Sequence, residues 1–128
     1  MKIKVLQKCK TFFLSLSEPF LKNEAFKYFS KYSMAGCYII YSEKLNKFYI
    51  GSTHEEISKR IEKHNQCAYG KHRFTSTASD WKLFLYISCR DNAHAVRVER
   101  KIKSMKSVVY IRNLEKYPEL IEKLVSST

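Results

Sequence analysis

The sequence has few glycines and prolines and no long apolar run. Its 128 residues include three Gly and two Pro, which argues against a disordered chain and against a glycine-rich phosphate-binding loop. No segment approaches the roughly 20 apolar residues that cross a bilayer. The four cysteines are far apart, without a C-x-x-C pair, so we expect neither zinc nor a disulfide framework. We interpret them as reduced, partly buried residues of a cytoplasmic protein.

Acidic residues are scarce relative to basic ones. Twelve Asp and Glu stand against 24 Lys and Arg, which gives a formal net charge of +12. In so small a chain this charge predicts a polyanionic partner. Nucleic acid is the leading candidate, because contacts of Lys and Arg with phosphate supply most non-specific affinity. Charge alone leaves a ribosomal or membrane-surface role open.

Residues 1–34 differ from the rest of the chain. Four lysines lie in the first ten residues, and the apolar stretch 11–16 is shorter than the about 7–15 residues of a secretory signal. Apolar residues at helical spacing indicate a basic, helical N-terminal extension. Three interpretations stay open: a segment that packs on the domain, an arm that touches DNA, or translated sequence upstream of a start at Met34. We therefore expect a separate domain at 35–128.

Two short segments, 36–41 and 47–52, are rich in β-branched and aromatic residues. The polar stretch between them favours an antiparallel hairpin. Each segment carries one tyrosine, Tyr38 and Tyr49. A lone tyrosine in a strand is usually a packing residue, so its meaning depends on the rest of the chain.

Further elements follow in the order helix, strand, helix, helix. We expect Ser52 or Thr53 to cap a helix that runs to about residue 67, and 81–88 to form a central, well-buried strand. Asp91 or Asn92 then caps a helix, and Pro118 begins the last one. The apolar stripe of the helix from residue 93 is predicted to consist of Ala95, Val98, Ile102 and Met105. The order β-β-α-β-α-α predicts a small α/β (α+β) domain, with a three-stranded, mainly antiparallel sheet flanked by helices.

The hairpin reads Gly36-Cys37-Tyr38, a turn, then Tyr49-Ile50-Gly51. With these motifs the chain resembles the GIY-YIG nuclease family, over about residues 35–114. Cys37 replaces the typical Ile, and we expect it to point to the opposite face from Tyr38. Ser52 stands where some members have a basic residue. No additional DNA-binding or zinc module is visible, so the chain is similar to the small stand-alone members.

The resemblance implies a catalytic set. Tyr38 would be the general base, Tyr49 would orient water and phosphate, and Arg60 would stabilise the transition state. His64, one helical turn after Arg60, would assist proton transfer or bind phosphate. A free tyrosine ionises near pH 10, so forming the phenolate at pH 7 costs roughly 4 kcal/mol. We expect Arg60 and a metal to offset most of this cost.

The resemblance also implies a metal ligand and a residue near the leaving group. Glu99, within Glu99-Arg100-Lys101-Ile102-Lys103, would hold Mg²⁺, for which Mn²⁺ could substitute. Asn113 is the candidate for positioning the leaving side. For one active site, Tyr38, Tyr49, Arg60 and Glu99 should converge.

The loop 69–80 combines cations with hydroxyl groups, both of which contact phosphate. A solvated loop without function is the competing interpretation. The residues predicted to bind substrate are Gly51, Ser52, Lys71, Arg73, Thr75, Ser76 and Lys103.

The leading functional hypothesis is a metal-dependent endonuclease that hydrolyses DNA phosphodiester bonds. The resemblance to small members suggests structured or branched DNA and a role in repair or recombination. The alternative is a non-catalytic nucleic-acid-binding module that retains the fold. A translation-associated basic protein is a third, weaker hypothesis. A membrane partner is not expected, and the oligomeric state stays open.

Overall fold

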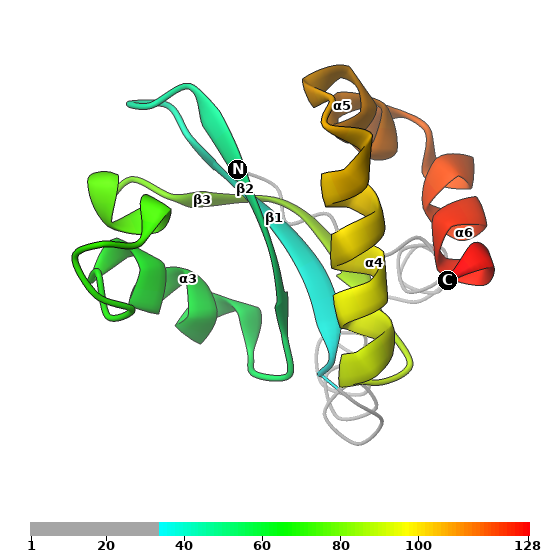
Figure 1. The fold of residues 1–128 in the computed structure, drawn as a ribbon, viewed down its shortest axis with the longest axis horizontal. Coiled ribbons are helices and arrows are strands. Elements are labelled where there is room, and N and C mark those ends of the chain that lie inside the picture. The colour runs from blue at the N-terminus through cyan, green and yellow to red at the C-terminus, as the bar shows by residue number, and fades with distance from the viewer. Residues whose placement is uncertain (1–33) are drawn as a thin grey trace, which may run out of the picture.

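The computed structural model describes residues 34–128, which form one sheet with helices on both faces (Figure 1). The predicted N-terminal extension, apart from Met34, lies outside the described residues. The sheet contains β1 (Gly36–Ser42), β2 (Lys47–Thr53) and β3 (Lys82–Ser88). Its order is β2-β1-β3, and both pairings are antiparallel. The predicted hairpin and three-stranded sheet are thus confirmed. The prediction that 81–88 is the central strand is wrong, because β1 is paired on both sides and β3 lies at an edge. The apolar run of β3 reflects burial on both faces, with Leu85 and Ile87 in one core and Leu83 and Tyr86 in the other.

The helices form two groups on opposite sides of this sheet. On one side lie α3 (Ile57–Asn65) and the short 3₁₀ helix η1 (Phe74–Thr77); on the other lie three helices (Figure 1). These three are α4 (Asn92–Met105), α5 (Val108–Lys116) and α6 (Pro118–Ser127).

Each face of the sheet has its own core, because neighbouring strand residues point to opposite faces. Tyr38 and Ile40 pack with Trp81 below α3. Cys37 and Ile39 pack on the other face, with apolar residues of α4, α5 and α6. The expected opposition of Cys37 and Tyr38 is therefore confirmed.

The start of α3 differs from the prediction. Thr53 is the last residue of β2, and its hydroxyl accepts a hydrogen bond of 3.0 Å from the backbone N–H of Glu55. The helix itself begins at Ile57, after Glu56, without a side-chain cap. Thr53 therefore shapes the turn between strand and helix, a local use that competes with helix capping for threonine hydroxyls.

The C-terminal helices also differ in part from the prediction. Asp91 caps α4 as expected, by accepting from the N–H of His94 at 2.7 Å. Met105, predicted in the buried stripe, is 44% exposed, because α4 ends there and the chain turns at Lys106 (φ 47°). Helix α5 was not predicted; Ser107 caps it. The terminal helix starts at Pro118 as predicted.

Candidate active site

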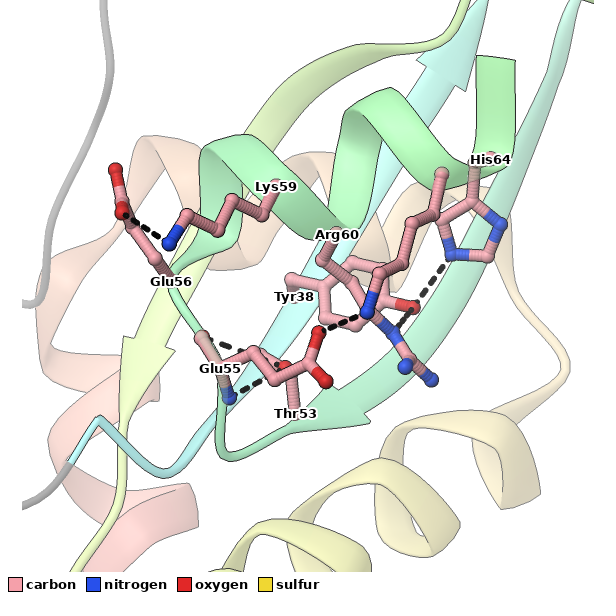
Figure 2. A network of polar contacts seen from close by, with 8 residues as sticks. Tyr38, Thr53, Glu55, Glu56, Lys59, Arg60 and His64 are labelled. Atoms are coloured by element: carbon pink, nitrogen blue, oxygen red, sulfur yellow. Dashed lines mark hydrogen bonds and ion pairs between the residues drawn. The ribbon is translucent and has the colours of Figure 1, made fainter. Parts of the chain in front are cut away.

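The Tyr38 side chain lies at the centre of the candidate site. Its ring is fully buried on β1, and its hydroxyl oxygen lies 2.7 Å from Nε2 of His64. Nε of Arg60 donates to the same oxygen at 3.3 Å. Figure 2 shows Arg60 and His64 reaching Tyr38 from α3. The spacing of four residues places both side chains on one face of the helix, as the sequence predicted.

Gly51 makes room for the Tyr38 ring. It is the direct partner of Tyr38 in the pairing of β1 with β2. A Cβ atom at Gly51 would lie 2.5 Å from the Tyr38 hydroxyl oxygen. Gly36 has the same relation to Tyr86, whose hydroxyl donates to the carbonyl oxygen of Met34. The two motif glycines are therefore required by the rings that lie against them.

Burial determines the protonation of the Tyr38–His64 pair. It raises the pKa of Tyr38 well above its ordinary value, and the hydrogen bond and charge of Arg60 offset this only in part. Burial, followed by the Arg60 charge, lowers the pKa of His64 to about 4. Both side chains are thus neutral at pH 7. The Tyr38 O–H then donates to Nε2 of His64, while its oxygen accepts from Arg60.

The expected lowering of the Tyr38 pKa is not found in the chain alone. The Arg60 contact does act in the predicted direction. Desolvation of the ring acts in the opposite direction and is larger, because Tyr38 has no exposed surface. The strand pattern alone did not reveal this degree of burial.

Tyr49 connects this cluster to α4. Its ring centre lies 6.3 Å from that of Tyr38 and 5.1 Å from that of His64. Nζ of Lys103 lies 5.9 Å from the Tyr49 ring centre and forms an ion pair with Glu99. Since α4 covers the other face of the sheet and β2 is an edge strand, Lys103 reaches Tyr49 around that edge.

Glu99, the carboxylate that the family resemblance assigns to the metal, is linked to Tyr49 through Lys103. Its side chain is 17% exposed and forms an ion pair with Lys103, on the next turn of α4. No group of three or more His, Cys, Asp and Glu side chains in residues 34–128 is arranged to hold a metal. A single carboxylate fits hydrated Mg²⁺, which commonly takes one or two protein carboxylates and fills its other positions with water and phosphate.

Two features of the site were not predicted. The Tyr69 ring lies against the Arg60 guanidinium, 4.7 Å from ring centre to Cζ, and 4.9 Å from the His64 ring. Glu55 pairs with Lys63 at 2.7 Å beside Arg60 (Figure 2). Tyr69 lies in an irregular loop, where no periodic pattern indicates which way a side chain points.

The predicted substrate-binding residues divide into accessible and buried ones. Lys71 and Arg73 are exposed in the loop before η1, and Ser52 is partly exposed on β2. Thr75 is 4% exposed, and its carbonyl accepts from Nε1 of Trp81, so its visible role is to hold the loop. The Ser76 hydroxyl is bonded to loop carbonyls. Asn113 lies partly buried on α5.

This arrangement combines a cation for phosphate, a paired tyrosine and histidine for proton transfer, and one carboxylate for a divalent metal. These are the parts of a metal-assisted phosphodiesterase. The family model of the GIY-YIG catalytic domain matches residues 34–110, more than half of the chain. The chain therefore belongs to the GIY-YIG family, which consists of endonucleases.

Membership carries general properties of the family. Its nucleases generally depend on a divalent metal, and DNA is the substrate that the family implies. No match was found among curated proteins or solved structures. Within residues 34–128, every helix is too short or too polar to span a bilayer.

Proposed function

We propose that this protein is a Mg²⁺-dependent endonuclease that hydrolyses phosphodiester bonds of structured or branched DNA, in repair or recombination. The observation that carries the proposal is the Tyr38 hydroxyl, held between Arg60 and His64 at 3.3 and 2.7 Å. A buried hydroxyl bonded to both a cation and a neutral imidazole is suited to proton transfer.

The hydrogen-bond directions give Tyr38 a route that avoids a free phenolate. As the attacking water loses a proton to the Tyr38 oxygen, the Tyr38 proton passes to Nε2 of His64. The proton is thus transferred in two coupled steps, and His64 carries the positive charge. Because the pKa of His64 is only about 4, the imidazolium gives its proton up readily afterwards.

Arg60 controls access to this hydroxyl. Of the two partners of Tyr38, His64 is buried and Arg60 is partly exposed. A phosphate that binds the guanidinium would draw Arg60 away from Tyr38. A hydrogen bond between two oppositely charged groups is stronger than a hydrogen bond from the guanidinium to a neutral phenol. Substrate binding would thereby open the hydroxyl to water.

Glu99 would hold the metal, and Lys103 would then be released from its present ion pair. When bound, Mg²⁺ would supply a positive charge on the scissile phosphate. Lys103, which already lies over the Tyr49 ring, would contact the phosphate backbone. Tyr49 would orient phosphate and water between the Tyr38 cluster and the metal. Asn113 is proposed near the leaving oxygen.

Ser52, Lys71, Arg73 and Ser76 are proposed to contact the DNA backbone, with Gly51 allowing its close approach. The exposure of Lys71 and Arg73 supports this role. Contacts of this kind bring affinity without sequence preference.

A second candidate function is a non-catalytic nucleic-acid-binding module. The observation that favours it is the raised pKa and full burial of Tyr38, which leave the free chain without an accessible base. The basic surface would persist in such a module.

Cleavage of supercoiled plasmid, duplexes, flaps and four-way junctions, with Mg²⁺ or Mn²⁺ and with EDTA, separates the candidates. The endonuclease proposal expects metal-dependent strand breaks that Tyr38→Phe and Glu99→Ala abolish. Binding without cleavage by either metal would favour the binding module. Stronger binding of structured RNA than of any DNA would favour the translation-associated role.

A further inference from the structure

Phe74 is an exposed aromatic side chain on the same side of the sheet as the candidate site. Its exposed fraction is 44%. The other large apolar side chains that are exposed in residues 34–128 lie on or beside α4, α5 and α6: Met105, Val108, Val109 and Tyr117. Phe74 instead begins η1, next to α3. A ring held out to solvent here needs a reason other than core packing.

The loop that presents Phe74 is held by hydrogen bonds from its own side chains. The Thr77 hydroxyl donates to the carbonyl of Phe74 at 2.7 Å. The Ser76 hydroxyl lies 2.7 and 2.6 Å from the carbonyl oxygens of Lys71 and Arg73. The ring is therefore presented by a defined turn, so a ligand would not have to order the loop first.

A series of ring contacts connects Phe74 to the candidate site. Its ring centre lies 6.0 Å from that of Trp81, which lies 6.4 Å from that of Tyr49. Trp81 is 2% exposed and is held by two hydrogen bonds. Its backbone N–H donates to Oδ1 of Asn65 at 2.8 Å, and its indole N–H donates to the carbonyl oxygen of Thr75 at 2.8 Å. Phe74 thus lies two ring contacts from Tyr49.

The surroundings of Phe74 are basic. Nζ of Lys47 lies 5.8 Å from its ring centre, and Arg73 precedes it in the chain. No acidic residue occurs between Glu62 and Asp80. An exposed aromatic ring among cations matches the two parts of a nucleotide, a base to stack and a phosphate to neutralise.

We propose that Phe74 stacks on an unpaired base of the DNA substrate, next to the strand that enters the active site. The proposal rests on the proposed function, because it assigns the substrate of the same site. A base inside an intact duplex has both faces covered by its neighbours, so a stacking side chain favours single-stranded arms and junction openings. Phe74 would thus give the protein its preference for structured DNA.

The test is binding of DNA by the full chain in EDTA, where cleavage does not interfere. Two fluorescently labelled probes are compared by anisotropy: a duplex with a single-stranded 5′ arm, and the same duplex fully paired. Stacking on one base contributes about 1–3 kcal/mol, so we expect Phe74→Ala to weaken binding of the armed probe at least about five-fold. Binding of the paired duplex should change less than two-fold. Phe74→Tyr, which keeps an aromatic ring, should retain the preference for the armed probe.

Two control variants separate stacking from charge and from general loss of apolar surface. Arg73→Gln should weaken the binding of both probes alike. It should also lower the magnitude of the slope of log affinity against log salt concentration by about 0.7–0.9. Val109→Ala, which alters a more exposed apolar residue on α5, should change the binding of neither probe. Unchanged circular dichroism melting shows that Phe74→Ala is folded; if it is not, Phe74→Leu, which keeps the apolar volume without an aromatic face, replaces it.

Equal weakening of both probes by Phe74→Ala, or no weakening of either, overturns the proposal. Full retention of the armed-probe preference by Phe74→Leu overturns it as well. These results do not depend on catalysis. If the wild type never cleaves DNA but Phe74→Ala loses the preference for the armed probe, only the endonuclease proposal is contradicted. If the wild type cleaves DNA and Phe74→Ala binds both probes as the wild type does, only the stacking proposal is contradicted.

Discussion

The ring of Tyr38 occupies the space that a side chain at Gly51 would need. The two residues are directly paired across β1 and β2, and a Cβ at Gly51 would meet the hydroxyl end of the ring. Any larger residue at Gly51 must move the Tyr38 hydroxyl away from Arg60 and His64.

Gly51→Ala should therefore impair cleavage more than its effect on stability explains. The added methyl would lie 2.5 Å from the Tyr38 hydroxyl oxygen, and overpacking of this kind costs about 1–3 kcal/mol. We expect cleavage to fall on the order of 100-fold, as for other displacements of a reacting group by about 1 Å. Plasmid nicking and thermal melting measure the two effects.

The matched control for that variant is Gly70→Ala. Gly70 has a φ of 98° and nothing within 4 Å of a Cβ, so an alanine there brings backbone strain without a contact to the site. Its melting temperature should fall while cleavage at a permissive temperature stays near that of the wild type. An equal loss of cleavage in both glycine variants would contradict the steric explanation.

Tyr38→Phe should retain the fold and lose cleavage. The change removes one oxygen from a ring that stays buried, and leaves Nε of Arg60 and Nε2 of His64 without their shared partner. We expect cleavage to fall about 10²–10⁴-fold, the usual contribution of a general base. DNA affinity in EDTA should change less than three-fold. Wild-type cleavage by this variant would rule out the proposed proton transfer.

Glu99→Gln should abolish metal-dependent cleavage at little cost to stability. The partly exposed pair with Lys103 contributes at most about 1 kcal/mol, so the loss of a metal ligand should dominate. Cleavage is measured against Mg²⁺ concentration, and unfolding by urea gives stability. Glu122→Gln, an exposed glutamate on α6, is the control for the change of charge. Mg²⁺-dependent cleavage by Glu99→Gln with an unchanged metal requirement would exclude Glu99 as the ligand.

Stability should depend on pH through His64. Its pKa is lowered from an unfolded value of 6.5 to about 4, so the folded state binds fewer protons between these values. Stability is then highest above pH 6.5 and falls as the pH drops toward 4, by roughly 3 kcal/mol in total. Urea unfolding from pH 7 to pH 4 measures this fall.

His64→Gln is the variant that tests this assignment. Glutamine does not titrate, so the part of the fall between pH 6.5 and pH 4.5 should largely disappear. The carboxyl groups of Asp80 and Asp91, whose pKa values are lowered by hydrogen bonds, act below this window. A pH profile that is unchanged in His64→Gln would show that another group titrates there.

Much of the fold could be predicted from the sequence, because the relevant signals are local. The alternation in β1 and the acidic cap of α4 at Asp91 depend on neighbouring residues alone. The unpredicted α5 begins with Val108 and Val109, exposed β-branched residues that give no amphipathic start. Thr53 was misassigned because the same hydroxyl can cap a helix or close a turn.

The candidate site was predictable to the extent that its residues follow the family motif. The position of Arg60 and His64 on one helix face followed from helical spacing, and both side chains contact Tyr38. Of the four residues expected to converge, Tyr38, Tyr49 and Arg60 lie in one cluster, and Glu99 is linked to it through Lys103. The burial of Tyr38 and the Arg60–Tyr69 contact depend on packing between segments distant in sequence. No local pattern encodes such packing, so the direction in which the pKa of Tyr38 shifts could not be anticipated.

The central place of β1 has a consequence for amide hydrogen exchange. Tyr38 lies on a strand paired on both sides, whereas Tyr49 lies on an edge strand with one neighbour. Amides of the middle strand should exchange only when the whole domain unfolds, and those along the open edge through small local openings. The two motif tyrosines thus belong to parts of unequal protection. The proposed base would stay fixed for as long as the domain is folded, while the edge strand that carries Tyr49 could adjust to a bound substrate.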